Sequence, residues 1–501
     1  MSLNLIVVVL YFVILLVIGA VASQRIKTKE DYIVGGRNVG FWVFVLLIIS
    51  SCTSGMSILG TSGLGFIGGW PTIWEQIFVP LTTAVCILLY GTKIFRISQK
   101  KTYMTIEDYF CHRFYSKKSI RSLSAFAVIT VSVIYLTGQY KAIGLVLSWL
   151  LKIPESQAIL FGGIIVMAYV LLGGLYAVAW ASLFQGLIIL VGIVAVAPFI
   201  IIKAGGMTHV NTVLASLDPN YVKAAFPQVY PPPKPYMVFT PAYLTSLGLL
   251  LGLGLGSAPH IINNVLTVKK SEYYKWAPLA AFGLYVIVMY LIKMVGFSAR
   301  VMAEEGHIFL PNVPNKTDYA FVEAIQYTMP GIVWPLFVVI VLAAVLSTTD
   351  RLMLTIGTSF SWNIFKNLIS PKASDKTINW VSRISIIVIT ACTMWAAMNP
   401  FQLLFWLIWT GIGVILSTFV APLLFGLYWR RATKEGALAG MGGGLIAALF
   451  FAYYDKFHQS LPVHFSLFGF LISILLVVGV SLVTKPTPED VLNETETGFY
   501  I

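Results

Sequence analysis

Residues 50–70 read SSCTSGMSILGTSGLGFIGGW, and they interrupt a segment that is otherwise apolar enough to cross a membrane. Glycines and hydroxyl side chains dominate the stretch. A glycine costs a helix about 1 kcal/mol relative to alanine, and a backbone group left unpaired in hydrocarbon costs more still. A broken helix therefore persists at this depth only where its freed carbonyls and amides meet protein, water or a ligand. The stretch predicts a cavity within the membrane.

The composition of the whole chain indicates a membrane protein. Of its 501 residues, 58% are hydrophobic and 11% are charged, whereas soluble domains carry about 25% charged residues. Apolar runs of about twenty residues are typical of spanning helices. We predict an all-α polytopic protein, one membrane domain over residues 1–501, with about thirteen transmembrane helices: 3–22, 41–67, 73–95, 122–150, 157–177, 180–203, 238–262, 277–301, 332–364, 378–398, 401–427, 435–454 and 463–484.

The net charge of +13 is spread unevenly over the connections between these spans. With the N-terminus outside, the internal connections carry 23 Lys and Arg residues and the external ones carry seven. Because cytoplasmic loops hold the excess of positive charge in membrane proteins, the chain is predicted to run N-out and C-in across the plasma membrane. The charge is thus a topology signal, and it argues against a nucleic-acid partner.

A second glycine-rich break lies in the seventh span, where residues 245–264 read TSLGLLLGLGLGSAPHIINN. The two broken spans are five apart. Two five-helix units of opposite orientation, each with a broken helix, form the inverted-repeat plan of many secondary transporters, which bind solute and ion at the breaks. The alternative is that both glycine runs are close-packing surfaces. The predicted layout is an extra N-terminal helix (3–22), two repeats (41–203 and 238–427), two C-terminal helices (435–484) and a cytoplasmic tail (485–501).

The charged candidates at membrane depth are Glu75, Lys141, Lys293, Asp350 and Arg351. Charges at membrane depth are functional candidates by default. Lys141 lies too far from the end of its span to reach water, so it requires a counter-charge or a ligand. Lys293 lies closer to the external end and is expected to extend to the surface. Arg351 is expected to pair locally or to reach the internal side.

Hydroxyl side chains cluster in the ninth span, which contains AAVLSTTDRLMLTIGTSFS at 343–361. Ser347 and Thr348 lie beside Asp350. Hard cations bind oxygen ligands from carbonyls, hydroxyls and carboxylates, and a broken helix nearby would supply the carbonyls. The alternative is that these hydroxyls bond carbonyls of their own helix, as Ser and Thr often do in membranes.

His260 directly follows the second break, where a hydrogen-bonded structural role and a solute-facing role are both open. The sequence shows no clustered acid, base, nucleophile or metal ligands and no phosphate-binding loop. We therefore expect no enzymatic activity and no organic cofactor.

Five stretches together resemble the sodium/solute symporter family, in its proline, pantothenate and monocarboxylate-like branch. The resemblance covers nearly the whole chain and implies a LeuT-like fold for the five-plus-five inverted repeat. The stretches are EDYIVGGRNVGFW (30–42), VLLGGLYAVAWASLFQG (170–186), APHIINN (258–264), AAVLSTTDRLMLTIGTSF (343–360) and GLYWRRATKEGALAGMGGG (426–444).

The resemblance implies a sodium site between the second and ninth spans, made by backbone carbonyls and hydroxyls. Two positions differ from the family pattern, because Cys52 and Ser182 replace more polar or acidic residues, and Asp350 would then serve as an accessory ligand. The implied Na⁺ ligands are Ser50, Thr53, Ala344, Ser347 and Thr348.

The family position of the solute implies Ser57, Gln139 and His260 as its contacts. A solute carboxylate would pair with Lys141 or lie at the exposed N-terminus of a half-helix, where backbone amides point inward. Asn264 stands where the family pattern has arginine. The predicted function is Na⁺-coupled import of a small carboxylate or amino acid, with the lipid bilayer and the solute as partners and no obligatory protein partner. Proton-coupled or sodium-independent transport is the alternative. A transporter-like sensor is less favoured, since only sixteen residues follow Lys485.

Overall fold

The structure is a computed structural model that describes residues 3–24, 26–227, 239–313, 316–331, 333–399, 404–457 and 461–495. These residues form helices and connecting loops, and the described part contains one isolated β-bridge, between Val39 and Val268. The all-helical prediction is confirmed. Within the predicted spans and the predicted tail, residues 238, 332, 401–403 and 496–501 lie outside the described ones.

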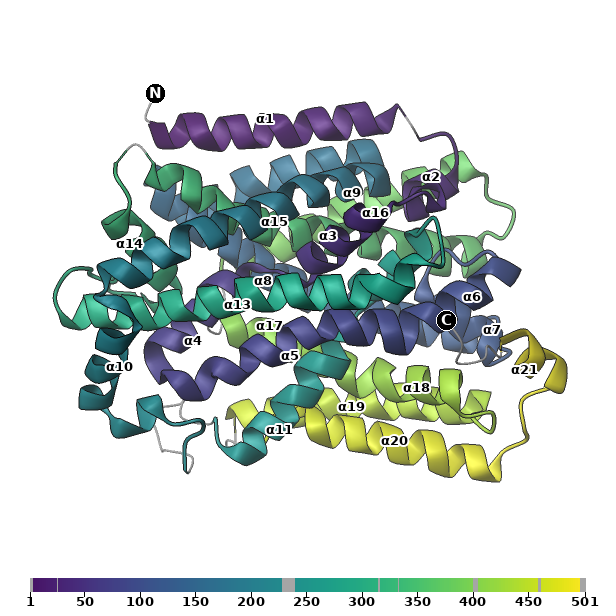
Figure 1. The fold of residues 1–501 in the computed structure, drawn as a ribbon. Coiled ribbons are helices and arrows are strands. Elements are labelled where there is room, and N and C mark those ends of the chain that lie inside the picture. The colour runs from purple at the N-terminus through teal and green to yellow at the C-terminus, as the bar shows by residue number, and fades with distance from the viewer. Residues whose placement is uncertain are drawn as a thin grey trace.

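The long helices lie roughly side by side, with α1 along one edge and α19 and α20 along the opposite edge (Figure 1). The helices that form the candidate spans, alone or as parts of one, include α1 (Leu3–Ser23), α3 (Phe41–Cys52), α4 (Thr61–Gly68), α5 (Glu75–Ala84), α6 (Thr92–Lys100), α8 (Ser119–Leu151), α9 (Glu155–Lys203), α11 (Pro241–Leu249), α13 (Tyr273–Glu304), α15 (Trp334–Thr358), α16 (Asp375–Ala397), α17 (Leu404–Ile415), α18 (Ala421–Tyr428), α19 (Lys434–Phe457) and α20 (Ser466–Val483). The remaining helices are α2 (Lys29–Val34), α7 (Ile106–Arg113), α10 (Gly206–Leu217), α12 (Pro259–Ile262), α14 (Ala320–Thr328) and α21 (Glu489–Thr495).

Both predicted helix breaks are present. In the described part of the chain, ten helices are long and apolar enough to cross a membrane, or twelve if each of two bent pairs is counted as one span. The first pair, Phe41–Cys52 with Met56–Gly68, bends by 66°. The second, Pro241–Leu255 with Pro259–Thr267, bends by 46°. The bends fall at the glycine- and proline-containing stretches that the sequence singled out.

Helix α9 contains a sharp kink at Gly174, whose backbone has φ 47° and ψ −140°. A straight helix of its 49 residues would be about 74 Å long, more than twice the hydrocarbon thickness of about 30 Å. The kink lies close to the predicted boundary between the spans 157–177 and 180–203, so the length fits two crossings. A side chain at Gly174 would be strained, since its Cβ would lie 2.4 Å from the ring of Tyr32.

Short π-helical turns flank both breaks, at Met56–Gly60 and Leu250–Leu255. Such turns are rare and occur often at functional sites, because they open the regular i−4 hydrogen-bond ladder. The glycines of these stretches also allow close packing, since a Cβ on Gly55 would lie 2.4 Å from that of Ala142. The close-packing interpretation and the broken-helix interpretation therefore both describe the first break.

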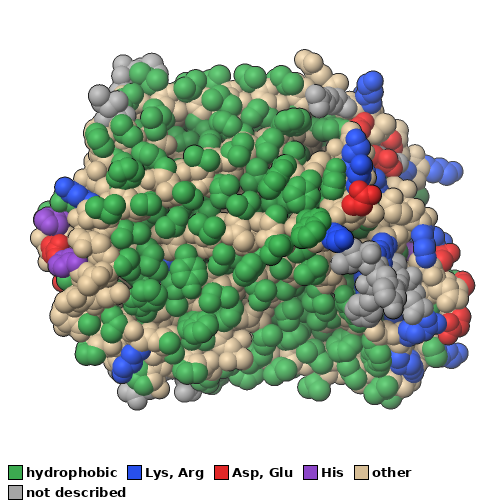
Figure 2. Space-filling view, in the orientation of Figure 1, with side chains coloured by type: hydrophobic (Ala, Val, Ile, Leu, Met, Phe, Trp, Pro, Cys, Tyr) green, Lys and Arg blue, Asp and Glu red, His purple; other side chains and the backbone are tan. Residues whose placement is uncertain are grey.

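Lys and Arg side chains gather at the end of the molecule that carries α2, α6, α7 and α21, while the long flank is largely hydrophobic (Figures 1 and 2). This basic end contains the connections predicted to be internal. The loops there interlock, because Arg113 donates hydrogen bonds to the carbonyls of Gly426 at 2.7 Å and Trp429 at 3.0 Å. The basic residues predicted to share one side of the membrane thus lie at one end of the molecule.

Candidate functional site

The first break leaves backbone carbonyls without helical partners. Helix α3 ends at Cys52, Thr53 is extended with φ −85° and ψ 114°, and the helix resumes at Met56. The Thr53 hydroxyl donates back to the carbonyl of Ile49 at 2.8 Å. The carbonyls of Ser50 and Thr53 are therefore available to a neighbouring element.

Helix α15 supplies the groups that meet these carbonyls. The Ser347 hydroxyl lies 2.9 Å from the Ser50 carbonyl, and the Thr348 hydroxyl lies 2.8 Å from the Thr53 carbonyl. The Ser347 hydroxyl is also 3.0 Å from the carbonyl of Ala344. The distances from the Ser347 hydroxyl to the Thr53 carbonyl and from the Thr348 hydroxyl to the Ser50 carbonyl are both 3.5 Å. All five residues are fully buried. The structure thus brings together, from two distant segments, the five residues that the family resemblance implied as Na⁺ ligands.

This set of donors fits a hard cation. It consists of three carbonyl and two hydroxyl oxygens, which carry no formal charge and no soft donor atom. The hydroxyl groups can rotate to direct their lone pairs at an ion. No group of three or more His, Cys, Asp or Glu side chains suited to a metal occurs among the described residues. The intrahelical alternative applies in part to Ser347, which also bonds the carbonyl of Ala344, and fully to Thr349, whose hydroxyl bonds the carbonyl of Val345 at 2.7 Å.

Asp350, the predicted accessory ligand, is directed away from this oxygen cluster. Its Oδ2 accepts a 2.9 Å hydrogen bond from the Tyr169 hydroxyl on α9, and its buried Oδ1 has no protein partner. The next residue, Arg351, is also buried, and its Nη2 lies 3.5 Å from the hydroxyl of Ser182. Arg351 therefore makes a local polar contact within the protein, as expected.

Two of the predicted solute contacts lie at the first break. The Gln139 side chain accepts a 3.1 Å hydrogen bond from the Gly55 amide through Oε1, while its buried Nε2 has no partner. The Ser57 hydroxyl donates to the Cys52 carbonyl at 3.3 Å and accepts from the Ser54 amide at 3.1 Å. Gln139 therefore caps the start of the second half-helix and keeps one donor free.

His260 joins this group from the second break. Its ring lies edge-on to that of Tyr135, with centroids 5.3 Å apart, one helical turn from Gln139 on α8. The buried Nε2 of His260 has no hydrogen-bond partner. The hydroxyl of Tyr285 lies close to Thr53 and Ser57 but outside hydrogen-bond geometry with either. Tyr285 could not be predicted from the sequence, because an aromatic residue in a span gives no signal of its own.

Lys141 is placed apart from these residues. Its ammonium group forms an ion pair with Glu155 at the start of α9. Residues two apart point away from each other on a helix, so Lys141 and Gln139 lie on different faces of α8. Glu155 is therefore the counter-charge that Lys141 was expected to require.

The expectation that Lys293 extends to the surface is wrong. Lys293 is fully buried and donates to the carbonyl of Thr61 at 2.9 Å and to Glu75 at 3.1 Å. Gln76 donates to the same Glu75 oxygen at 3.1 Å. Helices α4 and α5 cover this part of α13 and supply a carboxylate. The signal that could have revealed this pair was a second charge of opposite sign within a neighbouring span.

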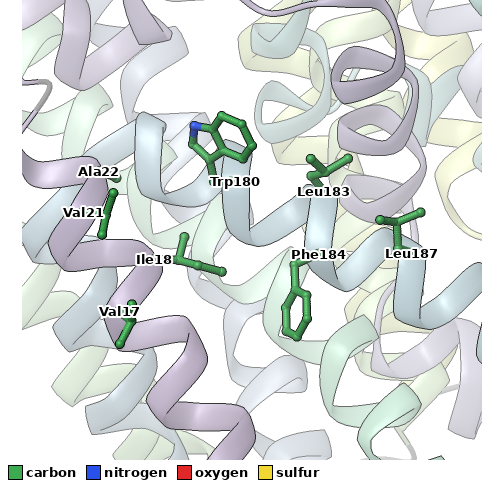
Figure 3. Close-up of a pocket in the computed structure, with 8 residues that line it drawn as sticks. All are labelled: Val17, Ile18, Val21, Ala22, Trp180, Leu183, Phe184 and Leu187. Carbon is green, nitrogen blue, oxygen red and sulfur yellow. The ribbon is translucent and has the colours of Figure 1, made fainter.

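Two cavities lie near these elements. One of about 450 Å³ lies between α1 and α9 and is lined by apolar side chains (Figure 3). Its lining residues Val17, Val21 and Trp180 are exposed on the hydrophobic flank, which suits packing against lipid better than binding of a polar solute. The other, of about 20 Å³, is lined partly by His260, Asn264 and Arg351, and it is large enough for about one water molecule.

The sequence comparisons identify the family. Residues 32–444 match the sodium:solute symporter family. The chain is 25% identical to the sodium/proline symporter of Haemophilus influenzae, covering 98% of this chain and 96% of the relative. It is 24% identical to the sodium/pantothenate symporter of the same organism, covering 94% and 96%.

Two solved structures have a similar fold. A Na⁺-coupled sialic acid symporter in a substrate-bound outward-open state aligns with a TM-score of 0.79 at 18% identity, over 97% of this chain and 98% of that one. A nucleobase-cation-symport-1 family transporter, Mhp1, aligns with a TM-score of 0.57 at 13% identity, over 93% and 97%. The transporter fold predicted from the motifs is confirmed. With more than four-fifths of its residues matched, the chain belongs to the sodium:solute symporter family.

Proposed function

We propose that this protein imports a small organic carboxylate together with Na⁺, and that the ion binds to the five-oxygen cluster between the first break and α15. One observation carries the proposal, namely that the carbonyls freed by the break of α3 lie within hydrogen-bond distance of the hydroxyls of Ser347 and Thr348. An ion bound between these oxygens would replace the two hydrogen bonds with direct coordination.

The position of this cluster explains how ion and solute are coupled. The ion would join α3 to α15, and the same break of α3 carries Ser57 and the Gly55 amide that Gln139 caps. Occupancy of the ion site therefore fixes the backbone that forms the solute site, and by linkage the solute must strengthen ion binding to the same extent. One Na⁺ entering at a membrane potential of 100 mV supplies about 2.3 kcal/mol of electrical work.

The solute would bind between the two breaks, where buried polar atoms lack protein partners. Gln139 Nε2, His260 Nε2 and the Tyr285 hydroxyl are such atoms, and buried polar groups without a partner are costly unless a ligand or water satisfies them. The positive end of the half-helix that begins at Met56 favours an anionic group. The relatives named for proline and pantothenate transport both act on solutes with a carboxylate, which supports this class.

We further propose the N-out, C-in orientation and the two inverted repeats at 41–203 and 238–427. The broken helices at matching positions and the basic end of the molecule support this layout. Labelling of single cysteines from either side of sealed vesicles tests it. A cysteine at Lys372, on the basic end, should react only with reagent supplied from inside.

The transport proposal is tested by uptake into proteoliposomes with an imposed Na⁺ gradient, an imposed H⁺ gradient or neither. Labelled proline, pantothenate and a short monocarboxylate serve as solutes. We expect accumulation of one of them only with the Na⁺ gradient, and its loss in Ser347→Ala. Thr349→Val is the matched control, because Thr349 bonds only its own helix. Accumulation driven by H⁺ and indifferent to Na⁺ would instead support the proton-coupled alternative. That alternative is favoured by Cys52 and Ser182, which replace more polar or acidic residues of the family pattern.

A further inference from the structure

A groove on the basic end of the molecule is lined by cationic side chains from two segments that are far apart in sequence. It has a volume of about 820 Å³ and lies between α6 and the start of α13. Lys100, Lys269, Lys270 and Lys275 are exposed along it, and Arg96 is half-buried. The full lining is Thr92, Phe95, Arg96, Gln99, Lys100, Lys269, Lys270, Ser271, Glu272, Tyr274 and Lys275.

The charge of this groove exceeds what topology alone requires. Five of its eleven lining residues are Lys or Arg, and Glu272 is the one acidic residue among them. The positive-inside rule demands basic residues on this side of the membrane, but it does not gather them around one concavity. Clusters of basic side chains in such pockets at the membrane surface attract anionic head groups.

The groove continues into the hydrophobic flank of the protein. One turn towards the membrane from Thr92 on the same helical rod lies Leu88, which is 48% exposed, and one turn from Lys275 lies Leu279, which is 64% exposed. Trp276, beside Lys275, is 60% exposed and suits the interface between head groups and hydrocarbon. The site therefore presents cations next to lipid-facing apolar surface, which matches an amphiphile with an acidic head.

We propose that this basic groove binds the head group of an anionic phospholipid, with its acyl chains lying along Leu88 and Leu279. The phosphate would be held by the lysines of the 269–275 loop and by Arg96 and Lys100. A free phosphate ion would use the same cations, but it would gain nothing from the apolar surface beside them. The volume also suits a head group with two phosphates, such as that of cardiolipin.

A lipid in the groove would act on the second broken span. Tyr274 lines the groove and donates a 2.6 Å hydrogen bond to the carbonyl of Val265, in the turn that follows α12. The β-bridge between Val39 and Val268 joins the same turn to the segment before α3. A head group bound by Lys269 and Lys270 would therefore stabilise the inner ends of both broken spans.

The test measures lipid binding to the purified full chain. Native mass spectrometry records retention of cardiolipin, phosphatidylglycerol and phosphatidylethanolamine, for the wild type, for Lys269→Gln/Lys270→Gln/Lys275→Gln, and for the control Lys372→Gln/Lys376→Gln. The control removes two exposed lysines from the same end of the molecule, outside the groove. A lysine near an anionic surface contributes about fivefold to binding. We expect cardiolipin retention to fall at least tenfold in the groove variant and to stay unchanged in the control.

Three results would overturn the proposal. Equal loss in the control variant would show unspecific attraction to the basic end. If millimolar inorganic phosphate displaced cardiolipin as effectively as a second anionic lipid does, the groove would be a site for free phosphate. Equal retention of phosphatidylethanolamine and cardiolipin would show that the groove does not select for a negatively charged head group. An unchanged thermal unfolding midpoint of the groove variant confirms that it is folded, and Na⁺-driven uptake, measured separately, does not decide any of these outcomes.

Discussion

The hydroxyl of Thr348 on the intact helix α15 lies 2.8 Å from the carbonyl of Thr53, at the open end of the broken helix α3. The two residues are 295 positions apart in the chain. Because an ion placed between them would bind to both elements at once, this contact is where ion occupancy can change the relative position of α3 and α15.

Replacing Thr348 by Val keeps the volume of the side chain and removes one of the five oxygens. Even groups that only support a metal ligand contribute about 10- to 100-fold to affinity. We therefore expect the Na⁺ concentration for half-maximal uptake to rise at least tenfold, with a smaller change in the solute KM at saturating Na⁺. Thr349→Val, one residue away, should leave both values near those of the wild type, since its hydroxyl bonds only Val345. Equal effects of the two substitutions would contradict a role for Thr348 in ion binding.

The substitution Gln139→Leu tests the solute site separately from the ion site. The substitution removes the free Nε2 donor and leaves the Gly55 amide without its partner. A buried donor without a partner costs about 1–3 kcal/mol. We expect the solute KM to rise about tenfold or more, as measured by initial uptake rates over a range of solute concentrations at saturating Na⁺. Thr137→Val on the same helix is the control, because the Thr137 hydroxyl bonds only the carbonyl of Val133. An unchanged KM in Gln139→Leu would remove Gln139 from the solute site.

The sequence was sufficient to predict those features that depend on local composition. The glycine runs predicted both breaks. The family resemblance predicted that the hydroxyls of Ser347 and Thr348 lie beside the carbonyls of the first break, as they do. The kink at Gly174 likewise lies near a predicted boundary between spans, because it depends on a single glycine.

Features that depend on pairing between distant helices were harder to predict. Lys293 was expected at the surface, because its distance from the end of its span says nothing of Glu75 on another helix. The counter-charge of Lys141 could not be named from the sequence, because its partner Glu155 lies beyond a turn in the chain. Tyr285 was missed altogether, since only its unpaired hydroxyl distinguishes it from core aromatic residues.

The ion pair of Lys293 and Glu75 predicts a double-mutant result. Removing one partner of a buried pair leaves an uncompensated charge and costs about 3–5 kcal/mol, whereas replacing both can be nearly neutral. Lys293→Met should therefore lower the thermal unfolding midpoint in detergent strongly, and Glu75→Gln/Lys293→Met should recover most of the loss. Lys376→Met, at an exposed position, should have little effect. A double variant as unstable as Lys293→Met would show that the bond from Lys293 to the Thr61 carbonyl matters more than the pair.

The contact of the short helix α21 with the basic end should depend on pH. Glu494 of α21 accepts hydrogen bonds from Lys101 and from His112, the latter at 2.7 Å, and these bonds lower the pKa of Glu494 below its usual value. Burial lowers the pKa of His112, against the opposing effect of Glu494. The docked state therefore favours neutral His112 and ionised Glu494. Its stabilisation by His112 is complete above the ordinary histidine pKa of about 6.5 and declines below it, and that by Glu494 is lost only as the pH falls through its lowered pKa.

Spin labels on cysteines at Asn493 and Lys118, both exposed, would report the docking of α21. We expect one narrow distance distribution at pH 7.5 and a broader one at pH 5, where the free histidine is protonated. His112→Gln should remove the change between these two pH values, because glutamine does not titrate. A label pair within α8 should keep its distance throughout, which shows that the membrane helices remain folded. A distribution that is the same at pH 7.5 and pH 5 in the wild type would show that apolar contacts of Val491 and Leu492, which are buried, hold α21 in place without the His112 contact.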